Sequence, residues 1–542
     1  MSISAGGQER SSSSIATSAV GQVIKSGSHI GYRLRQALSR DRLFTPVDTA
    51  SIAAVRVVLG LLVAIDAARY GQDFFYPSGG VLPFQFRYPF FHWVQESPEL
   101  SVYLPYVLFV SGIALAIGFL FRFFSVFCLM LFAYGFLLRA EYYLNHFYML
   151  IIMLFLLSIS PAHRSFSIDK LLFSNRDSFY APKIYLLLFK AQVEIILIYA
   201  GLVKINSDWL QLEPLRTWLH ARQNMAFVGD LWQSDLVVAV GAYGTILLHI
   251  VGAPLLLFAR TRLAVFLIYC VFHITNHFVF NIGIFPWMTI ACTTLFFAPD
   301  WPRRVLDLLS PSFLWRQPKP VRQASVLAAP RSIGTHALIV FAACWVSFQA
   351  LFPLRHLLYP GWVEWTDEGD RFAWRMKLTD RRSPGLLLAV HIPDLNTVHV
   401  PSLERYLSRG QYRRVSTIPY LTQELALQVA RLYKDELQVR DVEVFAYAPA
   451  TLNNRQPALL IDPTVDLAAT RPTLWHDAWV TKYNPNPLRR IEEVSVEELR
   501  TKRDLQQVLS SMGFPKPRSC YGPGATKPRL IEDEVCLLNS GK

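Results

Sequence analysis

The chain has few charged side chains for its length. Only 17% of its 542 residues are Asp, Glu, Lys or Arg, whereas soluble domains usually carry about a quarter. This shortage excludes a chain built wholly of soluble domains. Charged residues are scarce between Ser51 and Leu354 and common after Glu364. The sequence therefore predicts a membrane domain followed by a domain in water.

Several informative motifs are also missing. The sequence has no Asn-x-Ser/Thr sequon, so nothing indicates a glycosylated lumenal protein. It also has no glycine-rich phosphate loop and no internal repeat. Its Ser-rich start lacks a cleavable apolar core and predicts a disordered cytoplasmic leader, not a signal peptide. Only six cysteines occur; Cys520 and Cys536 lie in the polar tail and would pair if that tail faces an oxidising compartment. The other four fall in apolar runs, where cysteine is typically a small buried hydrophobe.

The net charge of +13 does not favour a nucleic-acid partner. Much of the excess lies in short loops beside apolar runs, where lysine and arginine set membrane topology. No compact basic patch of the kind that nucleic-acid binders carry is visible. We therefore expect a lipid bilayer as a partner and no nucleic acid.

Long apolar runs are abundant in the first part of the chain. A membrane-spanning helix needs about 20 mostly apolar residues. The sequence predicts a polytopic α-helical membrane bundle of about nine spans, several of them short. The candidate spans are Ser51–Tyr70, Val102–Phe121, Phe124–Leu138, Phe147–Ser160, Ile184–Lys204, Leu236–Phe258, Leu263–Phe280, Ile282–Phe297 and His336–Leu354.

The loops predict the orientation. With the N-terminus inside, every strongly basic connection falls on the cytoplasmic side, and an odd number of spans places the C-terminal region outside. From Trp362 to about Trp479, short alternating runs predict a mainly β extramembrane domain with one helix near Thr422–Asp435. An amphipathic helix is expected over Ile491–Leu509. The predicted organisation is a leader over 1–43, a transmembrane domain over 44–354, a β domain over 355–487 and a helical and extended tail over 488–542.

Ionisable residues inside spans are costly and are therefore functional candidates. Lys190, Glu194 and Lys204 share one stripe of the fifth span. The alternative is a buried Lys190–Glu194 ion pair with Lys204 reaching the interface. His273 and Asn276 share a face of the seventh span, where a hydrogen-bonded core cluster is favoured over a metal site because no ligand set is complete.

Several motifs occur in a defined order along the chain. They are Phe44-Thr-Pro-Val-Asp-Thr-Ala-Ser51, the Asn145-His146 pair, Ala200-Gly-Leu-Val-Lys204 with Asp208-Trp209, Phe272-His273 with Asn276, and Gly361-Trp362-Val-Glu-Trp365 with Trp374. In this order they resemble the vitamin K-dependent γ-glutamyl carboxylase family over roughly 43–487. The absence of sequons and the length suggest a bacterial member in an inner membrane.

The resemblance implies a coupled reaction. A reduced vitamin K-type quinol would be oxygenated to its epoxide, and the strong base so generated would allow carbon dioxide to be added to a peptide glutamate. Molecular oxygen and carbon dioxide would be consumed, and no metal is predicted. The partners would be the lipid quinol and a glutamate-containing peptide or protein.

The resemblance also implies roles for individual residues. Lys204 would be the catalytic base, because desolvation lowers a lysine pKa and leaves a free amine, and Asn145 and His146 would act beside it. For the segment Glu141–His146, an interfacial aromatic belt with ordinary polar ends is the alternative. The quinol would contact Tyr143, His273 and Asn276, and the peptide would contact Trp362, Trp365 and Trp374, for which interfacial anchoring is the alternative.

The sequence also departs from the family pattern. The family's double lysine is Val203-Lys204 here, so only Lys204 can carry the role. No cysteine pair joins the bundle to the outer domain, and the shorter C-terminal end leaves propeptide recognition open. Two other functions stay open: a quinol epoxidase without peptide carboxylation, and a membrane transporter, against which the β domain argues.

Overall fold

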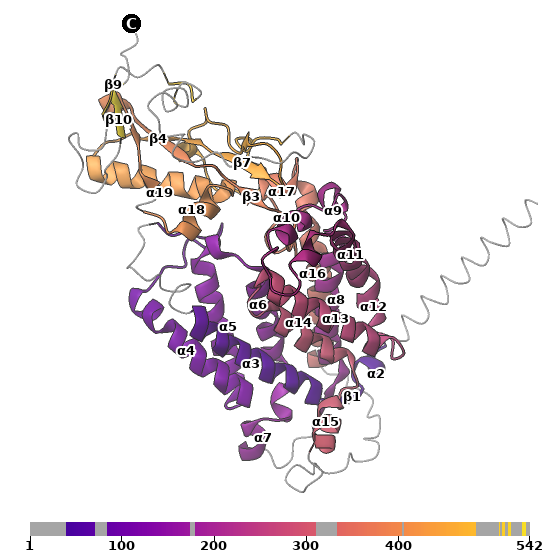
Figure 1. Ribbon diagram of the computed structural model, residues 1–542. Helices are drawn as coiled ribbons and strands as arrows, with labels where there is room; N and C mark the ends of the chain where they lie inside the picture. Colours follow the sequence, from indigo (N-terminus) through magenta and orange to yellow (C-terminus); the bar gives the residue numbers. More distant parts are fainter. Residues whose placement is uncertain are drawn as a thin grey trace, which may run out of the picture.

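The computed structural model describes residues 39–70, 84–173, 179–309, 333–403 and 406–483, with short pieces at 509, 512–514, 519–521 and 534–537. A helical bundle forms one end of the molecule and a sheet-containing domain the other, with α7 (Ile168–Phe173) and α15 (Trp301–Leu309) at the far end of the bundle (Figure 1). The predicted order of a membrane bundle followed by a mainly β region is confirmed.

All nine predicted spans are helical. Seven segments of the described chain are long and apolar enough to cross a membrane. They comprise α3 (Ala50–Tyr70), α4 (Pro98–Ile117), α5 (Phe121–Leu138), α8 (Lys183–Leu202), α11 with η5 and α12 (Asp235–Leu255), α13 (Arg262–Phe280) and α16 with η8 (Ile333–Leu358). The other two, α6 (Asn145–Ile159) and α14 (Phe285–Thr293), are shorter apolar helices.

Helices α3 and α4 touch through their backbones. A Cβ added at Gly60 would lie 2.5 Å from the Ala116 nitrogen, and one at Gly112 would lie 2.7 Å from the Gly60 oxygen. Each helix repeats a small residue four positions on, Ala64 and Ala116, which is the spacing that lets membrane helices approach closely.

The charges inside the bundle have different environments. Arg56 is buried and donates to four backbone carbonyls, including Ala162 O at 2.8 Å, so it ties α3 to the connection after α6. The alternative of a Lys190–Glu194 ion pair is not found among the described residues. Instead, the Lys190 amine lies 5.7 Å from the Phe296 ring centre, and both Glu194 carboxylate oxygens are buried without a hydrogen-bond partner among the described residues.

The outer domain is built on a five-stranded antiparallel sheet. Its order is β6-β4-β5-β10-β9, formed by Glu443–Tyr447, Leu387–Ile392, Thr397–Val400, Glu534–Leu537 and Ser519–Tyr521. A smaller sheet joins β3 (Arg381–Arg382), β7 (Pro449–Leu452) and β8 (Ala458–Leu459). Helix α19 (Pro419–Leu437) matches the helix predicted near Thr422–Asp435, and α18 (Arg409–Val415) precedes it.

The C-terminal tail is part of this domain. Strands β9 and β10 lie beyond residue 487 and extend the sheet, so the tail predicted over 488–542 contributes two of its five strands. Their register places Cys520 opposite Cys536. The helix expected over Ile491–Leu509 lies outside the described residues apart from Leu509. Residues 1–38 of the predicted leader also lie outside the described residues. The rest of the leader includes one helical turn, α2 (Arg40–Leu43).

Candidate functional site

Two adjoining cavities lie where the bundle meets the outer domain. The outer one has a volume of about 770 Å³ and the inner one about 90 Å³. Six residues line both, which shows that the cavities meet: Trp218, Phe280, Ile282, Phe285, Met376 and Lys377.

The inner cavity is apolar apart from a few side chains. Its walls include Ile196, Leu197 and Leu215, and its polar members include Lys204, His249, His273 and Asn276. The residues come from α8, α10 (Leu215–His220), α11, η5, α13 and α14 and from the connections that face the outer domain. Three residues predicted separately from the sequence (Lys204, His273 and Asn276) are therefore brought together.

Lys204 lies just beyond the end of α8 and is only 6% exposed. Its amine donates to Ala200 O at 2.9 Å and to Met376 O at 3.2 Å, and it lies 5.0 Å from the Trp209 ring centre. Lys204 forms no salt bridge within the part of the chain that the structure describes. Burial, and then repulsion from Arg375, lower the pKa of the amine to about 7. A substantial fraction of the amine is therefore neutral near pH 7.

The histidines of the inner cavity differ in their contacts. His273 is buried, is stacked on Tyr269 at 5.8 Å, and has no hydrogen-bond partner for either ring nitrogen among the described residues. His249 Nδ1 lies 2.8 Å from Thr245 O. Because a buried unpaired nitrogen is costly, His273 offers the cavity a free donor or acceptor.

The outer cavity is rich in charge. The Asp, Arg and Lys residues that line it are Asp367, Asp370, Arg375, Lys377, Asp380, Arg381, Arg413 and Arg414, which gives five cations against three acids. Most belong to the charged segment (Asp367–Arg381), and the two remaining arginines belong to α18. Within the charged segment, Asp367, Phe372, Trp374 and Lys377 have φ between 55° and 65°. Such backbone strain persists only where the surroundings impose it, and it gathers at functional sites.

Burial and nearby charge perturb this segment. Burial, followed by repulsion from Asp367, raises the pKa of Asp370 to about 7. Its carboxylate lies 3.2 Å from Arg375 Nε, and Arg375 also pairs with buried Glu364. Burial lowers the pKa of Lys377, whose amine lies 5.2 Å from the Trp218 ring centre where the two cavities meet.

Tyr143, Asn145 and His146 line the outer cavity together. The Tyr143 hydroxyl donates to Asn145 Oδ1 at 3.0 Å and accepts from Phe372 N at 2.6 Å. Asn145 Nδ2 donates to Arg375 O at 3.4 Å. Tyr143 and Asn145 therefore hold the charged segment against the start of α6. His146 packs against Phe147 at 4.6 Å and makes no hydrogen bond in the described structure.

A buried ion pair joins the short helix α9 (Ser207–Leu210), which follows α8, to the outer domain. Asp208 accepts from Arg455 Nη1 at 2.6 Å, from Arg455 Nη2 and from Asn453 Nδ2 at 2.6 Å. Asp208 and Arg455 are both buried. This junction ties the chain just after Lys204 to the turn that follows β7.

None of the three tryptophans predicted to bind peptide lines either cavity. Trp374 is fully buried and stacks on Tyr148 at 4.8 Å. Trp365 is buried, and its Nε1 donates to Thr481 O at 3.0 Å. The ring centre of Trp362 lies 4.8 Å from the Arg455 guanidinium. Trp362 and Trp365 pack within the outer domain, and Trp374 packs against α6 of the bundle, so their contact with a peptide stays a prediction without geometric support.

Sequence reasoning missed the cationic side chains of the outer cavity. Arg413 and Arg414 lie on α18, which is far from the charged segment in sequence. The density of charge between Asp367 and Arg382 was the one available signal. Among the described residues, no cluster of three or more His, Cys, Asp or Glu side chains could hold a metal ion.

Comparison with known families agrees with this architecture. Residues 44–301 match the HTTM domain, and residues 334–486 match the lumenal domain of vitamin K-dependent gamma-carboxylase. No solved structure matches the chain. The two matches cover the bundle and the outer domain that enclose the paired cavities. The chain is thus an integral membrane protein of the vitamin K-dependent γ-carboxylase family.

Proposed function

We propose that this protein is a γ-glutamyl carboxylase that couples oxygenation of reduced vitamin K to its epoxide with carboxylation of a peptide glutamate. The observation that carries the proposal is Lys204. It is a buried amine without an ion-pair partner among the described residues, in an apolar cavity that meets a cationic one. This arrangement supports a lipid-soluble reductant on one side and an acidic peptide on the other.

The inner cavity fits the aromatic head of a quinol. Its lining is mostly apolar, and the unpaired ring nitrogens of His273 and the Asn276 amide offer hydrogen bonds to quinol oxygens. Oxygenation of the bound hydroquinone supplies a base strong enough to remove a glutamate γ-proton. Lys204 begins the sequence by taking the proton of a quinol hydroxyl, as a neutral amine can near pH 7.

The outer cavity fits a peptide carboxylate. Arg414 and Lys377 line it without forming salt bridges among the described residues, and burial lowers the pKa of both. A substrate carboxylate relieves that cost by pairing with them. Lys377 also borders the inner cavity, so a glutamate held there lies beside the reduced quinol. His146 faces the same space and can hydrogen-bond the reacting groups.

The proposal is tested by reconstitution. The purified protein in lipid receives reduced vitamin K, labelled bicarbonate and a Glu-rich peptide, and Lys204→Met is compared with Lys190→Met as a second lysine of the same stripe. We expect label incorporation and epoxide formation in wild type and Lys190→Met, and neither in Lys204→Met. Epoxide without label would instead support a quinol epoxidase with another acceptor. Neither product in a folded wild-type protein would contradict the proposal.

We also propose the orientation. Arg303 of α15 bonds Asp48 and Ser165, so basic connections gather at the end of the bundle opposite the outer domain (Figure 1). The positive-inside rule then supports a cytoplasmic N-terminus and an extracytoplasmic outer domain, in a bacterial inner membrane. Labelling of single cysteines placed at Arg260 and at exposed Leu395 in intact cells tests this, since only the second should react with an impermeant reagent.

A further inference from the structure

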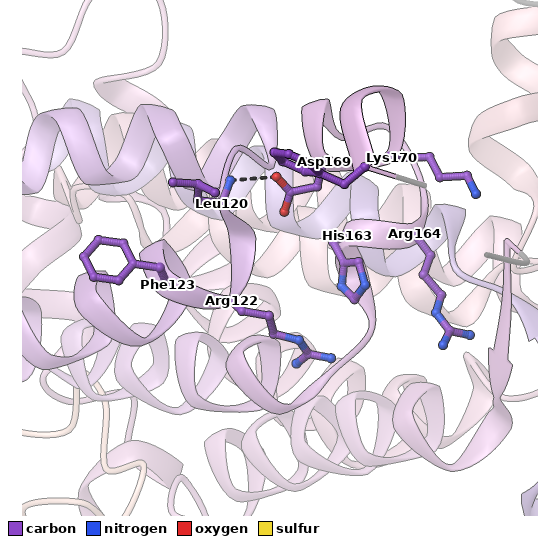
Figure 2. Close-up of a pocket in the computed structure, with 8 residues that line it drawn as sticks. Leu120, Arg122, Phe123, His163, Arg164, Asp169 and Lys170 are labelled. Carbon is purple, nitrogen blue, oxygen red and sulfur yellow. Dashed lines mark hydrogen bonds between the residues drawn. The ribbon is translucent and has the colours of Figure 1, made fainter. Parts of the chain in front are cut away.

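A third cavity, of about 390 Å³, lies at the end of the bundle opposite the outer domain. It is formed by the turn between α4 and α5 and by the connection from α6 to α7 (Figures 1 and 2). Its lining residues are Leu120, Arg122, Phe123, His163, Arg164, Asp169, Lys170 and Phe173. We call it the basic cleft, and nothing in the proposed carboxylase mechanism uses it.

The charge of the basic cleft is unbalanced. Among the described lining residues, Arg122, Arg164 and Lys170 are opposed by one acid, Asp169. That carboxylate is engaged at the start of α5, where it accepts from Leu120 N at 2.7 Å and Phe121 N at 2.8 Å. With His163 counted as neutral, the described lining residues carry a net charge of +2.

Contacts with the surrounding protein orient the three cationic side chains of the basic cleft. Arg122 Nη1 donates to Ser158 O at 2.8 Å, and Arg164 Nη1 donates to Tyr180 O at 2.6 Å. The Lys170 amine lies 4.9 Å from the Phe179 ring centre. A guanidinium has five N–H donors, so each arginine keeps donors for a ligand, and Arg164 Nε is buried without a hydrogen-bond partner in the described structure. Figure 2 shows His163 between the two arginines.

The rim of the basic cleft is apolar and exposed. Leu171, Leu172 and Phe173 of α7 are 78%, 62% and 69% exposed, and Phe123 is 58% exposed. Phe123 also belongs to the span α5, so this rim is at the membrane boundary. A soluble anion gains nothing from such a rim, whereas a lipid buries it against its acyl chains.

We propose that the basic cleft binds the phosphate of an anionic phospholipid. Arg122 and Arg164 hold the phosphate through charge-assisted hydrogen bonds, and Lys170 adds to the local positive field. The exposed α7 side chains and Phe123 lie among the acyl chains. The net charge of +2 favours an anionic headgroup over a zwitterionic one, because bilayers attract basic segments through their anionic lipids.

The test uses the full-length protein in nanodiscs of phosphatidylcholine alone or with phosphatidylglycerol, with bound lipid counted by native mass spectrometry. We expect retention of phosphatidylglycerol by wild type, and an affinity about tenfold lower in Arg122→Gln, as for the loss of one charged hydrogen bond. Arg260→Gln, a control at an exposed arginine between α12 and α13, should retain it. Equal retention by Arg122→Gln and wild type would overturn the proposal.

A second variant, at an exposed position where misfolding is not expected, and a measurement with inorganic phosphate complete the test. The phosphate measurement distinguishes a lipid from a free anion. Leu172→Ser changes an exposed side chain and should also weaken phosphatidylglycerol retention. Inorganic phosphate should neither displace the lipid nor raise the melting temperature of the protein in phosphatidylcholine. Thermal stabilisation by inorganic phosphate equal to that by phosphatidylglycerol would show that the cleft binds a free anion, and would refute a lipid site.

Discussion

Replacing Lys204 with methionine should abolish activity and at the same time stabilise the protein. Burial lowers the pKa of this amine from 10.5 to about 7. Such a shift corresponds to ~5 kcal/mol at neutral pH, the cost of removing the proton that the unfolded chain keeps. The two hydrogen bonds to Ala200 O and Met376 O offset about 1 kcal/mol each. Lys204→Met should therefore gain roughly 3 kcal/mol of unfolding free energy at pH 7.

The sign of the pH dependence gives a sharper test. Between pH 7 and 10.5 the unfolded chain binds a proton at Lys204 that the folded chain does not, so wild-type stability rises with pH in this window relative to Lys204→Met. The assay is unfolding of the reconstituted protein, followed by tryptophan fluorescence, for both proteins from pH 7 to pH 9.5. Parallel pH profiles, or a methionine variant less stable than wild type, would refute a neutral buried amine.

Three further outcomes follow from the geometry. Gly60→Leu should destabilise the bundle by about 3 kcal/mol through the clash with α4, whereas Gly244→Leu, with nothing within 4 Å of its Cβ, should not; thermal unfolding of both checks this. Asp208→Ala should cost roughly 3–5 kcal/mol because it strands a buried arginine, measured by unfolding and by faster proteolysis of the outer domain. Arg414→Gln should raise the peptide KM about tenfold with a smaller change in kcat, while exposed Arg409→Gln on the same helix should leave both unchanged.

The membrane bundle was largely predictable because its signal is local. Each of the nine apolar runs must satisfy its own backbone hydrogen bonds in lipid, so length and composition suffice to identify a helix. Lys204 and His273 were likewise visible as polar residues beside or within apolar runs. The helix α19 and the strands β4 and β6 carried their own periodicity.

Other predictions needed contacts that local patterns do not carry. The spacing of Lys190 and Glu194 allowed an ion pair, but neighbouring helices direct the amine to Phe296 instead. Strands β9 and β10 are short and lie far from their partner β5 in sequence, so only the folded sheet shows that the tail belongs to it. Trp365 and Trp374 were predicted to contact a peptide, yet both are buried, Trp365 in the outer domain and Trp374 against Tyr148 of α6.

The sequence by itself determined that this protein spans a membrane, carries an outer domain and offers a lysine at the boundary between them, because hydrophobicity and charge act over short stretches of chain. Only the tertiary structure decided that Lys204 lies in an apolar cavity beside His273, and that Arg414 and Lys377 lie in the adjoining one. Those residues lie far apart in the sequence. Their proximity, and the desolvation that perturbs their acidity, arise from packing between elements and not from any local pattern.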